Sequence, residues 1–252
     1  MAPDLTLVLD RLRASYGAAA DPDRAVPMRA YLRDQFPFLG IPSPRRRVLS
    51  REVLAGLPRP TADDLRDLAV ACWALPEREY QYFACDLLAR HVRLLGPDFL
   101  PTAGHLVTTK SWWDTVDALA GKVVGTVVAA YPATVSTMDD WLAAGNLWLA
   151  RTALLHQLTY QRRTDPDRLF RYCLALAGHR DFFIRKAIGW ALRQYAWTDP
   201  AAVRAFVDAH ATELSPLSVR EARKNLAQPS AAGDPEPVTG ADAPAWRSRE
   251  LR

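Results

Sequence analysis

The chain has little of several residue types that would mark common classes of protein. It has 3 cysteines, and none of them lies in a C-x-x-C spacing or beside a histidine cluster. An odd number of dispersed cysteines argues against a disulfide framework and against a structural zinc site. Such cysteine usage fits a reducing cytoplasm, which we expect to be the location of the protein.

Long apolar runs and cofactor motifs are also missing. No apolar run approaches the roughly 18 residues of a membrane-spanning helix. The first residues place Asp4 and Asp10 among the apolar ones without a basic leader, unlike a secretory signal. There is no glycine-rich phosphate loop and no cluster with metal-ligand spacing. We therefore expect a soluble protein that needs no cofactor, no metal and no membrane.

Lysine is scarce while arginine is abundant, at 4 against 28 residues, and the net charge is +4. Arginine suits phosphate recognition, although a GC-rich genome also raises the arginine content. The Pro- and Ala-rich segment 228–252 carries four acids and three arginines, so the rest of the chain holds a net +5. We expect residues 1–227 to form one domain and 228–252 to be a disordered tail. The positive charge is a mild indication of a nucleic-acid partner.

Helical periodicity dominates the rest of the chain. Apolar residues recur at the i, i+3, i+4 spacing of an amphipathic helix in almost every segment, beginning with residues 5–12. Several segments open with a residue that caps helices well, such as Thr61, Asp165 and Asp199. No segment shows sustained strand alternation, so the fold class is expected to be all-α.

A repeat organises these helices. The segments that begin at Trp112, Leu147, Phe182 and Leu217 align without gaps at offsets of 35 residues. The segments from Pro42 and Glu77 keep the same spacing less clearly. A period of this length with two helices per unit indicates an α-solenoid of stacked helix pairs, curved around a concave face.

Basic residues recur at one register of this repeat. The fifth aligned positions include Arg151 and Lys186, and the fourth include Arg185 and Arg220. If the second helix of each pair lines the concave side, these residues would form a basic groove for a polyanion. The alternative is that they lie on ordinary solvated helix faces, and periodicity alone does not decide between the two.

The stretch KSWWDTVDAL, residues 110–119, is unusually dense in tryptophan and aspartate. We interpret Ser111 as the N-cap of a helix, with Asp114 as its reciprocal partner in a capping box. Trp112 shares a face with apolar residues and is expected in the core. That leaves Trp113 and Asp117, four apart and on one face, with no nearby cation in sequence to neutralise the acid. They are candidate site residues, although surface acids are common.

A second aromatic signal lies in FFIRKAIGWALRQY, residues 182–195. Trp190 stands four residues after Lys186 and three before Arg193, on a polar and basic face. It is either an amphipathic tryptophan at a domain edge or a ring that faces a ligand. Arg151 belongs to the repeat between the two aromatic signals, so three consecutive repeats would contribute to one patch.

These segments resemble the AlkD-like family of bacterial DNA alkylation repair glycosylases. The resemblance runs from about Met28 to Leu226 and is carried by five stretches: YLRDQFPFLGIPSPRRR, SWWDTVD, LWLARTALLHQL, FFIRKAIGWALRQY and LSPLSVREA. It implies a right-handed solenoid of HEAT-like helix pairs that grips double-stranded DNA on its concave face. It also implies a monofunctional enzyme that removes positively charged N3- and N7-alkylpurines, such as 3-methyladenine and 7-methylguanine, without base flipping.

The resemblance assigns roles to single residues. Trp113, Asp117 and Trp190 would be catalytic, and Arg151 would contact DNA near the lesion. Tyr31, Lys186 and Arg193 are weaker candidates as DNA contacts. The implied protein is a cytoplasmic, nucleoid-associated monomer of base excision repair without an obligate protein partner. The extension after Leu226 and the start before Pro27 depart from the family pattern, and neither contains a catalytic candidate.

The chemistry of alkylpurine excision explains this choice of residues. The alkylated base is already cationic and leaves without a general acid, while positive charge develops on the deoxyribose. A carboxylate such as Asp117 would stabilise that charge and orient a water molecule. Indole faces beside the sugar would contribute roughly 0.5–2 kcal/mol each. A lyase would need an amine, for which Lys186 is the candidate, although a phosphate contact suits Lys186 better.

Two other functions remain open at this point. The first is a non-catalytic relative that binds branched or distorted DNA through the same groove, with steep salt dependence and no excision. The second is a HEAT-type scaffold for protein partners, which would have no need for Trp113 and Asp117 on one helix face.

Overall fold

The computed structural model describes residues 4–226, and the expected tail at 228–252 lies outside the described residues. Within 4–226 the chain is helical and contains no strand, as the sequence predicts. The α-helices are α1 (Leu5–Ala18), α2 (Pro22–Tyr31), α3 (Ser43–Leu54), α4 (Ala62–Ala74), α5 (Arg78–Arg90), α6 (Leu100–Thr108), α7 (Trp113–Leu119), α8 (Gly125–Ala130), α9 (Val135–Ala143), α10 (Leu147–Leu155), α11 (Pro166–Ala175), α12 (Phe182–Tyr195), α13 (Pro200–Ala209) and α14 (Pro216–Ala222).

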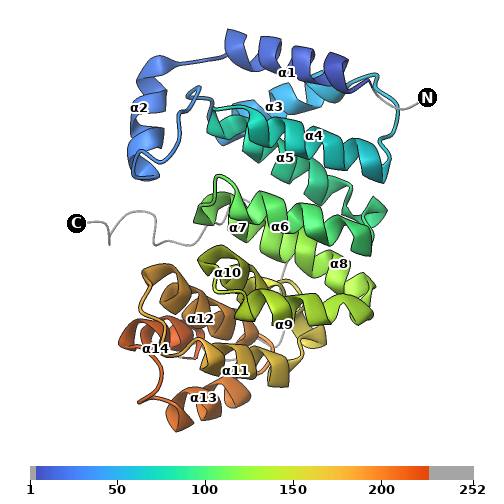
Figure 1. Ribbon diagram of the computed structural model, residues 1–252. Helices are drawn as coiled ribbons and strands as arrows, with labels where there is room; N and C mark the ends of the chain where they lie inside the picture. Colours follow the sequence, from blue (N-terminus) through green and yellow to red (C-terminus); the bar gives the residue numbers. More distant parts are fainter. Residues whose placement is uncertain (1–3, 227–252) are drawn as a thin grey trace.

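These helices form stacked pairs, and the predicted period is confirmed. The second helices of successive pairs, α3, α5, α7, α10, α12 and α14, begin at residues 43, 78, 113, 147, 182 and 216, which are 34 or 35 apart. Each packs against the next, and the first helices α4, α6, α9, α11 and α13 lie beside them (Figure 1). The two upstream units, which align less clearly in sequence, keep the same spacing in the structure.

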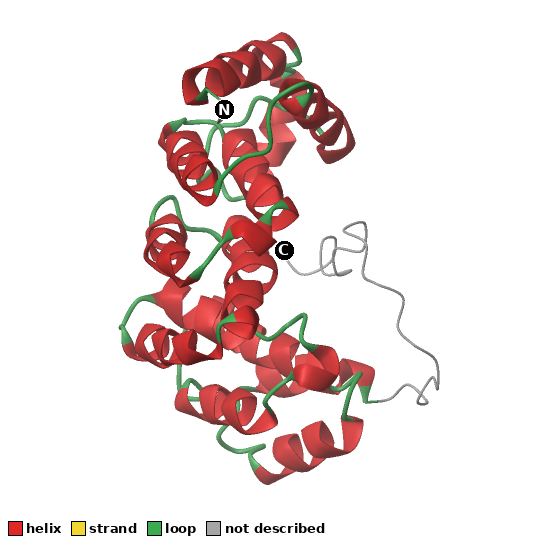
Figure 2. Ribbon diagram, turned by 90° about the vertical axis from the view of Figure 1, so that its right-hand side faces the viewer, coloured by secondary structure: helices red, strands yellow, loops and turns green. Residues whose placement is uncertain are grey.

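The stack follows an arc, which Figure 2 shows from the side. This arrangement is an α-solenoid. The right-handed sense of the superhelix and the use of a concave face for DNA remain predictions.

Helix starts follow local sequence at most positions. Thr61 caps α4 in a full capping box with Asp64, and Asp165 and Asp199 cap α11 and α13. These three starts confirm the sequence interpretation, because short polar side chains satisfy the free N–H groups of a first turn.

Neighbouring repeats approach each other very closely at two glycines. A Cβ atom at Gly125 would lie 2.0 Å from the carbonyl oxygen of His156, and one at Gly189 would lie 2.4 Å from Cβ of Glu221. No side chain fits at either distance, so both positions require glycine. The separation between neighbouring repeats is therefore set partly by backbone contact.

The second helix that begins at Trp113 contains an irregular turn. Residues 120–124 form a π-helical segment that joins α7 to α8. A π turn holds one more residue than an α turn, and such turns are frequent at functional sites. Here the segment begins directly after the turn that carries Asp117.

The core consists of one large cluster and a smaller one. The large cluster runs through the stack from Val8 to Ala222. The smaller one forms under α2, around Ala25, Leu32 and Phe38. Because α2 stands apart from the helix pairs (Figure 1), this small cluster is what holds it against the rest of the molecule.

The cysteines, the possible metal ligands and the lengths of the helices can be described for residues 4–226. The three cysteines are free and buried, and burial raises the pKa of the Cys72 thiol to about 12. Among residues 4–226, no group of His, Cys, Asp or Glu side chains is placed to hold a metal ion. No single described helix is long and apolar enough to cross a bilayer; the run from Trp113 to Ala143 has the length only across a bend of 119°.

The predicted row of exposed basic residues is wrong at its fifth positions. Arg151 is 3% exposed and Lys186 is 9% exposed, and the equivalent Glu221 is fully buried. This register points between neighbouring repeats instead of into solvent, because it lies on the side of each second helix that packs against the next. Its charges form ion pairs there.

His156, at the C-cap of α10, is a buried titratable group away from the candidate site. It is 1% exposed, its Nδ1 lies 2.6 Å from the carbonyl oxygen of Ala153, and its Nε2 is buried without a hydrogen-bond partner among the described residues. Burial lowers its pKa to about 4, against the backbone hydrogen bond that raises it. The folded protein therefore disfavours the charged imidazole.

We expect this histidine to make stability pH-dependent. Since the pKa is lower in the folded state than in the unfolded state, its stabilising contribution is complete above about pH 6.5 and is lost as the pH falls toward about 4. The loss should reach about 3 kcal/mol. Urea denaturation at several pH values should show a smaller decline for His156→Gln than for the wild type. Equal declines would contradict this assignment.

Candidate functional site

The stretch that begins α7 is organised differently from the sequence interpretation. Trp112, not Ser111, is the N-cap residue, and no side chain caps the helix. The hydroxyl of Ser111 donates to the carbonyl oxygen of Val107. The predicted capping box is therefore wrong, because the carboxylate of Asp114 is bound by a buried cation from the preceding repeat.

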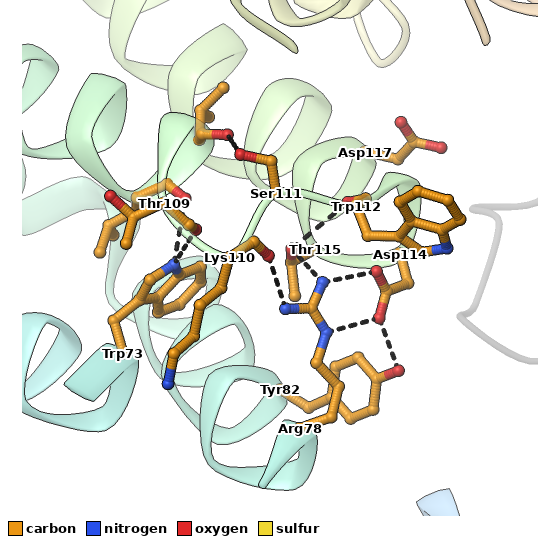
Figure 3. Close-up of polar contacts among 12 residues, drawn as sticks. Trp73, Arg78, Tyr82, Thr109, Lys110, Ser111, Trp112, Asp114, Thr115 and Asp117 are labelled. Carbon is orange, nitrogen blue, oxygen red and sulfur yellow. Dashed lines mark hydrogen bonds and ion pairs between the residues drawn. The ribbon is translucent and has the colours of Figure 1, made fainter. Parts of the chain in front are cut away.

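That cation is Arg78 at the start of α5 (Figure 3). Its Nε and Nη2 donate to the two carboxylate oxygens of Asp114 at 2.9 and 2.6 Å. Nη1 donates to the carbonyl oxygen of Lys110 at 2.8 Å, and Nη2 also reaches Thr115 Oγ1 at 2.8 Å. The Tyr82 hydroxyl donates to Asp114 at 2.7 Å. One fully buried guanidinium thus fixes the backbone before α7 and its first turn.

The Arg78 guanidinium is also covered by an aromatic ring. Its central carbon lies 3.9 Å from the centre of the Phe36 ring, and Phe36 packs on the small cluster under α2. The segment that contains α2 is therefore joined to the start of α7 through this cation.

Contrary to the sequence prediction, Trp112 does not share a buried helix face with Val116 and Leu119. Val116 and Leu119 are buried, but Trp112 precedes the helix and is half-buried. Its ring lies 5.1 Å from Phe183 and 5.9 Å from Trp148, measured between ring centres. The three rings connect the first turns of α7, α10 and α12.

Asp117 is paired with a cation that lies far from it in the sequence. Nε and Nη2 of Arg151 donate to its two oxygens at 2.7 and 2.8 Å. The guanidinium comes from the next repeat, 34 residues later, so it is not near Asp117 in sequence. Arg151 Nη1 also donates to the carbonyl oxygen of Phe183. All three nitrogens of Arg151 are thus engaged within the protein.

The Asp117 carboxylate is buried but not saturated with donors. Its side chain is 13% exposed, and each oxygen accepts one hydrogen bond from Arg151, whereas an ionised carboxylate can accept about four. Burial raises the pKa of Asp117, the Arg151 guanidinium opposes the rise, and the nearby Asp114 adds to it. Asp117 is thus an oriented carboxylate with acceptor capacity to spare.

Trp113 lies on the first turn of α7, one turn before Asp117. It is half-buried, and its ring meets the ring of Tyr31 edge to face, with centres 5.8 Å apart and planes at 83°. Both rings pack on the small cluster under α2. The structure therefore brings Tyr31, Trp113, Asp117 and Arg151 into one region.

Trp190, Lys186 and Arg193 make their contacts around α12. Trp190 is half-buried and packs against the large core cluster. Lys186 Nζ donates to Glu221 of α14 at 2.8 Å, and Arg193 Nη1 donates to the other oxygen at 3.0 Å. These two cations, expected on a basic face beside Trp190, instead bind a buried acid. α12 is tied to the Asp117 region through the Arg151–Phe183 bond.

The sequence analysis missed Arg78 and Glu221. Both are fully buried, and each pairs with opposite charge about one repeat away, Arg78 with Asp114 and Glu221 with Lys186. Opposite charges about one repeat apart are visible in the alignment of the repeats, and this spacing could have indicated both ion pairs.

The Asp117–Arg151 pair should be important for stability. Arg151→Met leaves a buried carboxylate without a partner, so we expect the free energy of unfolding at pH 7 to fall by about 3–5 kcal/mol. The double variant Arg151→Met/Asp117→Asn removes both charges and should recover part of this loss in urea denaturation. A double variant no more stable than Arg151→Met would show that the lost ion pair is not the cause.

Comparison with known proteins identifies the family of the chain. Residues 12–226 match the family described as DNA alkylation repair enzyme. A solved structure, a predicted DNA alkylation repair enzyme from Enterococcus faecalis, is 36% identical and superposes with a TM-score of 0.75, covering 83% of this chain and 98% of the other. No curated protein matches the chain. The chain therefore belongs to the family of DNA alkylation repair enzymes.

Proposed function

We propose that this protein is a DNA glycosylase that hydrolyses the N-glycosidic bond of positively charged N3- and N7-alkylpurines in duplex DNA. The observation that carries the proposal is the Asp117 carboxylate. It is buried, held in one orientation by Arg151, and able to accept further hydrogen bonds. A carboxylate of this kind suits a reaction in which a cation develops beside it.

The leaving base needs no protonation because it already carries the positive charge. As the bond to C1′ lengthens, charge moves onto the deoxyribose, and a preorganised carboxylate stabilises it without reorganising. Asp117 also has free acceptor positions for a water molecule that attacks C1′. Excision then leaves an abasic site and a free alkylpurine.

The tryptophans would flank the sugar in this reaction. The face of an indole attracts a cation, with roughly 0.5–2 kcal/mol for each contact. This role for Trp113 is supported by its contact with the Tyr31 ring and by its position on the helix that carries Asp117. Trp190 would approach from α12. Both rings would also keep bulk water away from the carboxylate.

Arg151 acts in this proposal through Asp117. Its guanidinium is bound to Asp117 and to Phe183. It would orient the carboxylate and keep it ionised. Any contact with the DNA backbone near the lesion would be made from the edge of the Asp117–Arg151 ion pair. Lys186 is a poor nucleophile for a lyase, since its ammonium is paired with the buried Glu221. The proposed enzyme is therefore monofunctional.

Duplex DNA would lie along the concave face, with alkylated purines recognised in place and no base flipping. Exposed arginines on α3, including Arg45, Arg47 and Arg51, provide positive charge for phosphates. Tyr31 and Arg193 are the further DNA contacts of the proposal. We place the enzyme in the cytoplasm as a nucleoid-associated monomer of base excision repair, acting without a cofactor.

Base release from methylated duplex DNA tests the proposal. The wild type should liberate 3-methyladenine or 7-methylguanine, detected by chromatography. Asp117→Asn should reduce the single-turnover rate at least about 100-fold, because a charge aimed at the transition state is lost. Trp190→Ala should reduce it by roughly 2- to 30-fold.

Asp140→Asn, which changes an exposed acid on α9, is the matched control and should keep the wild-type rate. If the wild type binds duplex DNA with steep salt dependence but releases no base, the protein is instead a non-catalytic DNA-binding relative. If the wild type does not bind duplex DNA even at low salt, the protein is instead a scaffold for protein partners.

A further inference from the structure

We propose that Arg78 and Asp114 form a positioning pair for the candidate carboxylate: they fix the first turn of α7 and set the net charge beside Asp117. This inference rests on the proposed function for its kinetic consequences, while its physical basis is the contact geometry of α5 and α7. Neither residue has to touch DNA.

The first step is the position of Asp114 on the helix. It precedes Asp117 by three residues on α7, and side chains at this spacing are neighbours on a helix surface. Two carboxylates one turn apart repel each other, and each disfavours ionisation of the other. Asp114 does act on Asp117 in this direction.

The second step is the way Asp114 is neutralised. It accepts two hydrogen bonds from the guanidinium of Arg78 and one from the hydroxyl of Tyr82, and its side chain is 7% exposed. The Arg78 charge is fully buried beside it. The Asp114 carboxylate beside Asp117 is therefore opposed by a buried cation at hydrogen-bond distance.

The third step concerns the other charged groups around α7. From α10, Arg151 binds Asp117 directly. From α5, besides Arg78, Glu79 binds the N–H groups of residues 39–41 and Asp86 pairs with Arg46. His105 of α6 and Lys122 of the π segment are exposed. Lys186 of α12 pairs with Glu221. Arg78 is thus the cation that offsets Asp114.

The final step is the link to geometry. Arg78 also binds the carbonyl oxygen of Lys110 and the hydroxyl of Thr115, on either side of Trp112 and Trp113. Lys110 has a positive φ of 50°, a strained backbone for a residue with a side chain. The contacts of Arg78 stabilise this turn. We infer that they thereby fix the orientation of the first turn of α7, which carries Trp113 and precedes Asp117.

The proposal predicts that removing the negative charge of Asp114 and removing the positive charge of Arg78 shift the pKa of Asp117 in opposite directions. Asp114→Asn should lower the pKa of Asp117 by about 0.5–1 unit, because the carboxylate is lost and the buried cation remains. Arg78→Gln should raise it by a similar amount. Arg78→Gln/Asp114→Asn should return it to within about 0.3 unit of the wild type. A role in stability alone would give no such pattern.

Two readouts measure the shift. Carbon-13 NMR of labelled aspartate, assigned with Asp117→Asn, titrates the carboxylate directly and needs no activity. In the pH profile of the single-turnover rate of base release, the fall at low pH should shift together with the pKa of Asp117, because the reaction needs the ionised carboxylate. Arg78→Lys keeps the positive charge but loses the two parallel hydrogen bonds of the guanidinium. It should therefore lower the rate by several-fold without shifting the pH at which the rate falls.

Asp139→Asn is the matched control, since Asp139 also accepts hydrogen bonds from an arginine and a tyrosine, Arg171 and Tyr172, but on α9 and α11. It should shift neither readout. The proposal is overturned if Asp114→Asn lowers thermal stability yet leaves the Asp117 titration within about 0.2 unit of the wild type, or if Arg78→Lys shifts it as Asp114→Asn does. If the wild type releases no base, the proposed function fails, and the NMR titration still decides this inference.

Discussion

The ion pair between Asp117 and Arg151 is the interaction on which the candidate site depends. It joins two adjacent repeats, α7 and α10, with both carboxylate oxygens bound by one guanidinium. A buried carboxylate without this partner would be protonated or would draw in water. With it, the Asp117 carboxylate is held in one orientation by two hydrogen bonds. The fold thus tolerates a buried acid at this place because the neighbouring repeat supplies the opposite charge.

The same kind of contact recurs along the stack, with a difference that bears on function. Asp114 is surrounded by Arg78 and Tyr82, and Glu221 is bound by Lys186, Arg193 and Lys224. Each of those acids accepts three hydrogen bonds and serves to join repeats. Asp117 also lies between two repeats but has a single partner, and its greater spare acceptor capacity distinguishes this candidate catalytic acid from the other two.

The sequence was sufficient for the architecture and for part of the site. A 35-residue offset is visible because each second helix repeats its apolar face, and the helices begin where the alignment places them. Asp117 and Trp113 were identifiable from their spacing on one face. The ion-pair partners of the aspartates could not be identified, because Arg151 lies 34 residues from Asp117 and Arg78 lies 36 residues from Asp114. Side-chain direction between packed helices depends on their rotation, which periodicity does not fix.

A site assembled from consecutive repeats makes its geometry a property of the whole stack. Asp117, Arg151 and Trp190 come from α7, α10 and α12, so their separations follow from how those helices pack. Gly189 lets α14 contact α12 directly beside Trp190, where any side chain would meet Glu221. The last repeat therefore packs directly next to that tryptophan, although it contributes no candidate catalytic residue. Under the proposed function, changes far from the sugar would alter excision through this packing, because a displacement of about 1 Å is enough to disturb a preorganised site.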